Sequence, residues 1–151
     1  MIYKLLVSAV RRHLEETLPL IKQLTEVNVM SRPIEGGREI GEIVLHVLRS
    51  LEYYMKGITT NQWETLPYNI ETYDSAESII ELAEKVFEKA KVYSSLISTS
   101  DLGRKIEVFN RPATVTELLL EMIEHSIHHR GQITVYYRLL GITPIVIPYI
   151  I

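Results

Sequence analysis

The sequence predicts an all-α protein, and more specifically a four-helix bundle, from three observations. Apolar residues recur at helical spacing over four long runs of the chain. Two of these runs open with capping-box patterns, and segments marked by proline or glycine separate all four. Only one short segment alternates as a strand would. Four amphipathic helices bury their apolar faces against one another, so we expect one bundle domain over residues 1–151.

The first helix is expected over residues 2–26, approximately, where leucine, isoleucine and valine recur every three or four positions. Pro19 lies inside this run and removes a backbone hydrogen bond, so we expect a kink there. A loop over 28–37, which contains Pro33, leads to the second helix, expected over about 39–58.

The third helix is expected to follow a polar connection over 59–73. It begins with a capping-box pattern at residues 74–77 and continues to about residue 96. Beyond a turn, residues 104–109 alternate enough to predict a short extended segment.

The fourth helix begins with a second capping-box pattern at residues 114–117 and continues to Leu139. Gly141 and Pro144 are typical of a helix end. The tail over 142–151 is strongly apolar, so we expect it to pack on the bundle or on a second subunit.

Composition excludes several classes of function. The net charge of −3 argues against a protein that binds the phosphate backbone of nucleic acids. The chain has no cysteine, so a metal site would use nitrogen and oxygen ligands. No apolar run approaches the ~18 residues of a membrane span, and no cleavable leader pattern is present. We therefore expect a cytoplasmic protein without a nucleic-acid or membrane partner.

Three histidines predict a metal site. His125 and His129 are four residues apart, so on a helix both imidazoles project from one face, one turn apart. Two such rings can share a divalent ion, and His46 on the second helix is the best candidate for a third ligand. Three nitrogen ligands leave positions open for water, a thiol or substrate, as in reactive zinc sites. Core or surface histidines that only form hydrogen bonds are the other interpretation, and spacing leaves both open.

Two glutamates could orient these rings, because Glu42 and Glu121 each precede a candidate ligand by one turn. The alternative is that each is solvated or paired with an arginine. The usual HExxH protease chemistry is excluded, since Ser126 stands where the general base would be.

Other polar side chains near the histidines have similar alternatives. Gln132 lies one turn past His129 and could form a hydrogen bond near the site, or pack within the bundle. Ser50 and Tyr53 follow His46 on the same side of the helix and could line a pocket above it, although Tyr53 also fits the core. His128 points about 100° away from His129, which favours a surface or interface position.

The residues around the histidine pair resemble a known family. The run HSIHHRGQ over 125–132, followed by Tyr136, Arg138 and LLG at 139–141, is similar to the C-terminal signature of the DinB/YfiT-like proteins. These are metal-dependent four-helix bundles of the DNA-damage-inducible group. The run IGEIVLH over 40–46 is similar to the helix of that family that carries its first histidine. The similarity covers nearly the whole chain.

The resemblance implies that His46, His125 and His129 are the metal ligands and that the ion is zinc or nickel. Members of known activity include transferases and isomerases that use a low-molecular-weight thiol activated by the ion. The family is often dimeric, so we expect a homodimer, which would suit the apolar tail. The family name does not imply DNA binding.

Two functional hypotheses follow. The first is a metal-dependent hydrolase or a thiol-dependent transferase whose small-molecule substrate is unknown and whose three-histidine site activates water or a thiol. The second is a non-catalytic dimeric stress-response or binding protein with a structural metal or none. The apolar tail and the lack of an obvious general base favour the second.

Overall fold

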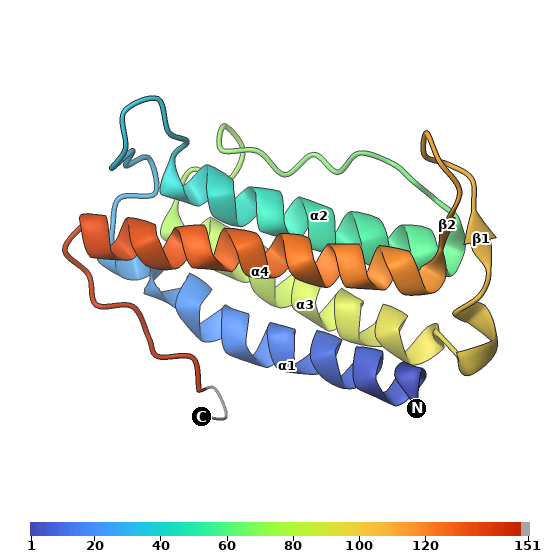
Figure 1. Ribbon diagram of the computed structural model, residues 1–151. Coiled ribbons are helices and arrows are strands. Elements are labelled where there is room, and N and C mark those ends of the chain that lie inside the picture. The colour runs from blue at the N-terminus through green and yellow to red at the C-terminus, as the bar shows by residue number, and fades with distance from the viewer. Residues whose placement is uncertain (149–151) are drawn as a thin grey trace.

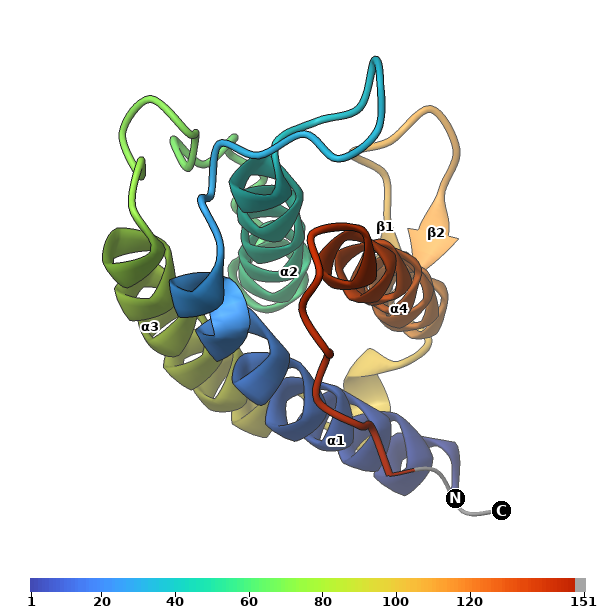
Figure 2. The same ribbon diagram turned by 90° about the vertical axis from the view of Figure 1, so that its left-hand side faces the viewer.

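Four long helices form the protein, as Figure 1 shows for the computed structural model, which describes residues 1–148. They are α1 (Ile2–Lys22), α2 (Ile40–Thr60), α3 (Ala76–Leu96) and α4 (Val115–Leu139). Helix α2 packs against α3 and α4, and α1 contacts the same two helices from the opposite side. The end-on view in Figure 2 shows the four arranged around a common interior. The predicted all-α four-helix bundle is confirmed.

The first helix is shorter than its predicted run. Helix α1 continues without a break through Pro19 to Lys22, and a 3-10 turn, η1 (Gln23–Glu26), completes the run. The predicted 2–26 segment is thus helical throughout but changes its hydrogen-bond pattern near its end.

Helix α2 carries much of the core, since Val44, Leu48 and Leu51 on it have no exposed surface. It ends at Thr60, where Asn61 takes the left-handed conformation (φ 59°) that commonly terminates helices. Gly57 near this end lies under the Trp63 ring, and a Cβ there would meet a ring carbon at 2.3 Å. The chain can therefore fold Trp63 back onto α2 only because residue 57 is glycine.

The two capping boxes differ in how well they were predicted. At α4, the Thr114 hydroxyl accepts from the Glu117 N–H at 3.2 Å, and the Glu117 carboxylate accepts from the Thr114 N–H at 2.6 Å. At α3, the cap is Ser75, whose hydroxyl accepts from the Ser78 N–H at 3.1 Å. The predicted box at 74–77 is therefore wrong by one residue, because the serine pair satisfies the same backbone groups.

A small hairpin precedes α4. Following a 3-10 turn, η2 (Thr99–Asp101), strand β1 (Lys105–Ile106) pairs antiparallel with β2 (Ala113–Thr114). The predicted extended segment over 104–109 is thus only partly a strand. Its second half enters the loop over 107–112, which joins the two strands.

The apolar tail packs on the bundle over part of its length. Ile142 donates its backbone N–H to the Tyr137 carbonyl at 2.8 Å, and Pro144 is buried. Ile145 and Val146 are exposed, by 46% and 83%. The rest of the predicted tail segment, 149–151, lies outside the described residues.

No helix within residues 1–148 has the length and hydropathy that crossing a membrane needs.

Candidate metal centre

The candidate centre lies between α2 and α4. These helices run in opposite directions in Figure 1, so the first half of α2 faces the second half of α4. His46 comes from α2, His125 and His129 come from α4, and all three side chains are half-buried. The two segments are 79 residues apart in sequence, so the bundle fold itself brings the imidazoles together.

The three imidazoles converge through their Nε2 atoms. The His46 and His125 Nε2 atoms are 3.0 Å apart, and those of His125 and His129 are 3.1 Å apart. One candidate ligand atom from each residue lies within 4.8 Å of the other two. The rings meet edge to face, with centroids 4.5–4.9 Å apart.

These distances fit a shared divalent ion. With Zn–N bonds of about 2.0–2.1 Å, two ligands of a tetrahedral ion lie about 3.3 Å apart. Both short contacts of His125 are close to that separation. A neutral imidazole carries at most one hydrogen at Nε2. Hydrogen bonds among the three rings therefore do not fully account for both close contacts of His125 Nε2. One cation at the centre could accept a lone pair from each ring.

The environment keeps the imidazoles neutral. Burial, followed by the neighbouring His129 and His125, lowers the pKa of His46 to about 4. Burial is also the main cause that lowers the pKa values of His125 and His129. The neutral ring is the form that binds metals, so all three donors are available near neutral pH.

Gln132 contacts the His129 ring at Nδ1, the nitrogen that does not face His125. Its Oε1 lies 2.6 Å from His129 Nδ1, a contact that suits an Nδ1–H donating to the amide oxygen. That tautomer leaves the His129 Nε2 lone pair free for a metal. The Gln132 Nε2 atom is 3.4 Å from His128 Nε2, so Gln132 lies between the two histidines.

The two predicted glutamates are engaged elsewhere. Glu42 accepts from the Arg49 guanidinium at 2.6 Å, and Arg49 also donates to the Tyr68 carbonyl. Glu121 accepts a weak hydrogen bond from the Tyr54 hydroxyl at 3.5 Å and lies 3.9 Å from Arg111. Within residues 1–148, His125 Nδ1 is buried without a hydrogen-bond partner.

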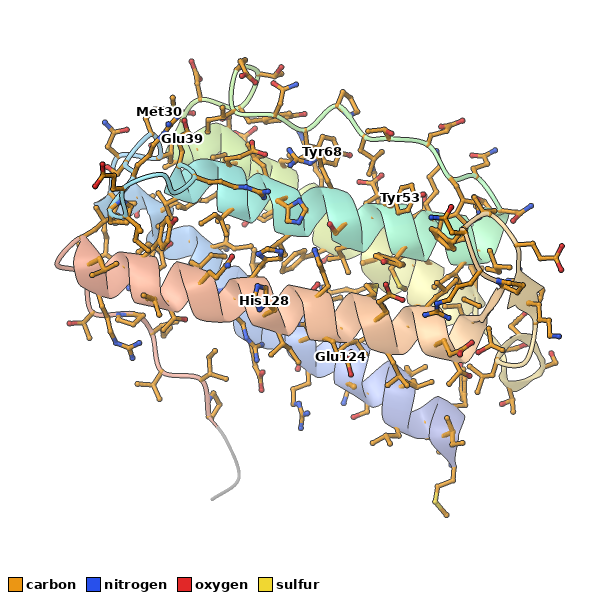
Figure 3. The ribbon with its side chains drawn as sticks, turned by 45° about the horizontal axis from the view of Figure 1, so that its top comes forward. Met30, Glu39, Tyr53, Tyr68, Glu124 and His128 are labelled. Atoms are coloured by element: carbon orange, nitrogen blue, oxygen red, sulfur yellow. The ribbon has the colours of Figure 1, made fainter. Side chains whose placement is uncertain are left out.

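The other residues predicted near the centre differ in burial and in the neighbours that they contact. Ser50 is half-buried one turn after His46. Tyr53 faces the long loop instead, with its ring 5.3 Å from that of Trp63. His128 is exposed on α4, and Figure 3 labels both His128 and Tyr53 on their helices.

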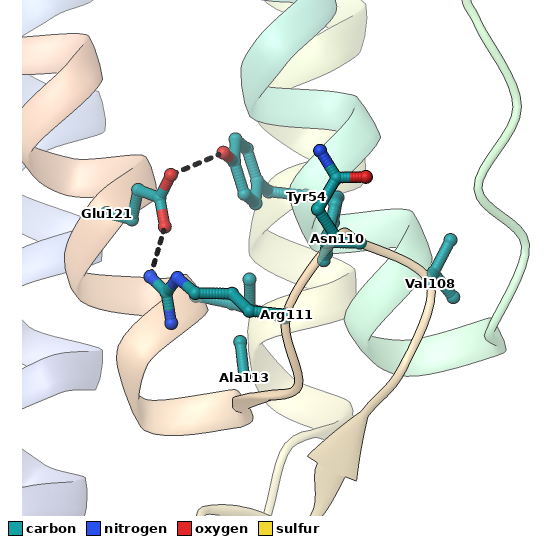
Figure 4. Close-up of a pocket in the computed structure, with 8 residues that line it drawn as sticks. Tyr54, Val108, Asn110, Arg111, Ala113 and Glu121 are labelled. Atoms are coloured by element: carbon teal, nitrogen blue, oxygen red, sulfur yellow. Dashed lines mark hydrogen bonds and ion pairs between the residues drawn. The ribbon is translucent and has the colours of Figure 1, made fainter.

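The sequence interpretation missed a cavity nearer the start of α4. It has a volume of about 460 Å³ and lies beneath the loop over 107–112, between Tyr54 of α2 and Glu121 of α4 (Figure 4). Tyr54 lies two turns after His46, so helical spacing could have identified it. Arg111 could not have been identified in this way, because it reaches the cavity from a loop.

Known proteins match this chain over almost its whole length. A family model described as the DinB family matches residues 1–150. The uncharacterized protein YjoA of Bacillus subtilis (strain 168) is 26% identical over 141 residues, or 91% of this chain and 90% of its own length. The crystal structure of the DinB-like protein YjoA from Bacillus subtilis gives a TM-score of 0.75 at 26% identity and covers 95% of each chain. A DinB-like protein from Bacillus cereus, 23% identical, has the same fold with a TM-score of 0.75 over 97% of this chain and 95% of its own.

Proposed function

The chain belongs to the DinB family, and from that premise we propose that His46, His125 and His129 bind one divalent metal ion, zinc or nickel. The observation that carries the proposal is the convergence of three Nε2 atoms from two helices within 4.8 Å. Nitrogen ligands of this kind suit both metals.

We further propose that the centre serves a metal-dependent hydrolase or a transferase that uses a low-molecular-weight thiol. When bound, the ion would act as a Lewis acid that lowers the pKa of a coordinated water or thiol. Three protein ligands are the number found at reactive zinc sites, where the fourth position is left for a small molecule.

The protein side chains have their own parts in this proposal. Burial keeps the three imidazoles neutral, so each can donate a lone pair. Gln132 would hold the Nδ1 proton of His129 and thereby fix the orientation of that ring. Arg49 holds the Glu42 carboxylate, which supports a donor set made of neutral nitrogens alone.

Metal analysis of protein purified without a histidine tag tests the proposal. We expect about one zinc or nickel ion per chain, and none in His125→Ala, which loses one of three ligands. His128→Ala is the matched control, because His128 is an exposed histidine on the same helix outside the cluster and should leave the metal content unchanged. Equal metal content in His125→Ala and the unaltered protein would overturn the assignment.

A second candidate is a non-catalytic dimeric binding or stress-response protein whose metal is structural. Exposed apolar side chains on α4 and the tail favour it, and they include Ile127, Val135, Leu139 and Val146. Thermal unfolding with and without a chelator discriminates between the two candidates. A structural ion predicts a large fall in Tm on chelation, whereas a reactive centre in a bundle with its own core predicts a small one.

A further inference from the structure

The cavity beneath the 107–112 loop lies nearer the start of α4 than the candidate metal centre does. Glu121, on its wall, lies one turn before His125 on α4, and the three histidines themselves do not line it. Its volume of about 460 Å³ falls within the range of small-molecule sites. A molecule held here would therefore leave the three imidazoles in place.

Three polar side chains of this cavity contact one another. In Figure 4, Glu121 lies between Tyr54 and Arg111, which approach its two carboxylate oxygens. Burial and the Glu121 charge raise the pKa of Tyr54, so its hydroxyl stays protonated and donates. The Glu121 carboxylate thus already has one hydroxyl donor and one cationic neighbour.

Arg111 has donors to spare. Its closest approach to Glu121 is 3.9 Å, which is too long for a hydrogen bond, and Glu121 is its ion-pair partner within residues 1–148. A guanidinium presents five N–H groups in a planar fork that matches a carboxylate. The unused N–H groups of Arg111 therefore favour a ligand whose hydrogen-bond acceptors carry a negative charge.

Apart from Asn110, the rest of the lining is apolar. Val108, Phe109 and Leu118 form much of it, and Val108 remains 50% exposed, so apolar surface is available to a ligand. The Phe109 ring also meets the Trp63 ring edge to face at 5.1 Å. Trp63 is the single tryptophan of the chain, so its fluorescence should respond to occupancy of the cavity.

We propose that this cavity is a second binding site, which takes a small amphipathic carboxylate with its apolar body against Phe109 and Leu118 and its carboxylate on Arg111. This inference does not depend on the proposed function, since the lining of the cavity contains none of the three histidines. Aligned in this way, the ligand leaves the Tyr54–Glu121 contact intact.

Titration of Trp63 fluorescence with phenylacetate tests the binding. We expect saturable binding of phenylacetate, with phenylacetamide weaker by about tenfold because it lacks the charge that Arg111 recognises. Acetate should bind more weakly still, because it lacks the apolar body. Tighter binding of phenethylamine than of phenylacetate would show that Glu121 selects a cation and would overturn the proposal, as would no saturable binding of phenylacetate.

Arg111→Gln identifies the anchoring group. It should weaken phenylacetate binding about tenfold and leave phenylacetamide binding unchanged. Arg111 is 66% exposed, so the variant should fold, which circular dichroism would check. Arg138→Gln is the matched control, because Arg138 is an exposed arginine near the other end of α4 and should bind phenylacetate normally.

Repeating the titration in His125→Ala separates this inference from the proposed function. Phenylacetate binding that persists there and is weakened about tenfold in Arg111→Gln supports the cavity, whatever the metal analysis shows. Binding lost in His125→Ala but retained in Arg111→Gln would place the carboxylate at the histidines and overturn the inference. The metal content of Arg111→Gln should equal that of the unaltered protein, so failure of the cavity leaves the metal assignment standing.

Discussion

Gln132 fixes one ring of the candidate metal centre through a single contact, 2.6 Å from its Oε1 to His129 Nδ1. Removing this acceptor in Gln132→Ala should weaken metal affinity by about 10- to 100-fold, because the ring loses its preferred tautomer and orientation. Competition with a chromogenic chelator measures the affinity.

Gln132→Glu should restore most of that affinity, because a carboxylate oxygen accepts from the same Nδ1–H. Gln62→Ala, at an exposed glutamine, is the control and should bind metal normally. Equal affinity of Gln132→Ala and the unaltered protein would show that the contact does not position the ring.

His13 should make the stability of the protein sensitive to acid. Burial, with a smaller effect of Arg130, lowers its pKa from 6.5 to about 4. Between these values the unfolded chain binds a proton that the folded protein does not, so stability falls as pH decreases through this window. The loss from this group between about pH 7 and pH 5 is at most about 2 kcal/mol.

Urea unfolding at both pH values measures the effect. His13→Gln should lose less stability on acidification than the unaltered protein, since glutamine does not titrate. The candidate metal ligands are present in both proteins, so they do not account for a difference. Identical pH dependence in the two proteins would contradict the assigned role of His13.

At this scale, helical spacing predicted that His125 and His129 share a face and identified His46, beside a buried stripe, as the best candidate to meet them. It could not predict the partners of the glutamates. Arg49 is seven residues from Glu42, and Arg111 reaches Glu121 from a loop whose path no helical pattern describes.

The end of α2 depends on a close approach between Gly57 and Trp63. Gly57→Ala places a methyl group where a ring carbon lies 2.3 Å away. Displacing the indole should cost about 1–3 kcal/mol of unfolding free energy, despite the better helix propensity of alanine. Urea unfolding followed by circular dichroism measures the loss.

A double-mutant cycle with Trp63→Leu provides the control. The smaller side chain relieves the clash, so the two substitutions together should cost less than the sum of their separate effects. Strict additivity would mean that the Trp63 ring does not oppose a side chain at position 57.

Among the structural elements, the helices were predictable and their short neighbours were not. The Thr114–Glu117 box gives one consistent register, whereas residues 74–78 offer two overlapping capping patterns, and sequence alone does not choose between them. The two-residue strands are too short to show a period, so the partner strand Ala113–Thr114 was missed.

The whole molecule carries an exposed apolar stripe that supports the proposed homodimer. Ile127, Val135 and Leu139 recur at four-residue multiples along α4 and are 45%, 48% and 55% exposed. Ile145 of the tail and Ile127 border the same groove. Surface of this kind is typical of protein–protein contacts.

Sedimentation velocity tests the homodimer. Val135→Glu should yield a monomer, because it places a charge within the apolar stripe. Val92→Glu, at an exposed valine on α3, is the matched control and should remain dimeric. A monomer for the unaltered protein, or a dimer for Val135→Glu, would contradict this arrangement.

The bundle architecture and the family could be predicted for the chain as a whole, because four periodic runs and the HxxxHRGQ signature extend over most of its length. The cavity beneath the hairpin loop could not, because it forms only where α2, α4 and that loop come together.

Anomalous diffraction at the zinc and nickel edges, from crystals of the untagged protein, tests the convergence of the three histidines most directly. We predict one anomalous peak about 2.0–2.1 Å from the Nε2 atoms of His46, His125 and His129. A peak bonded to His125 and His129 without His46, or a metal bound elsewhere with no peak between α2 and α4, would contradict the account.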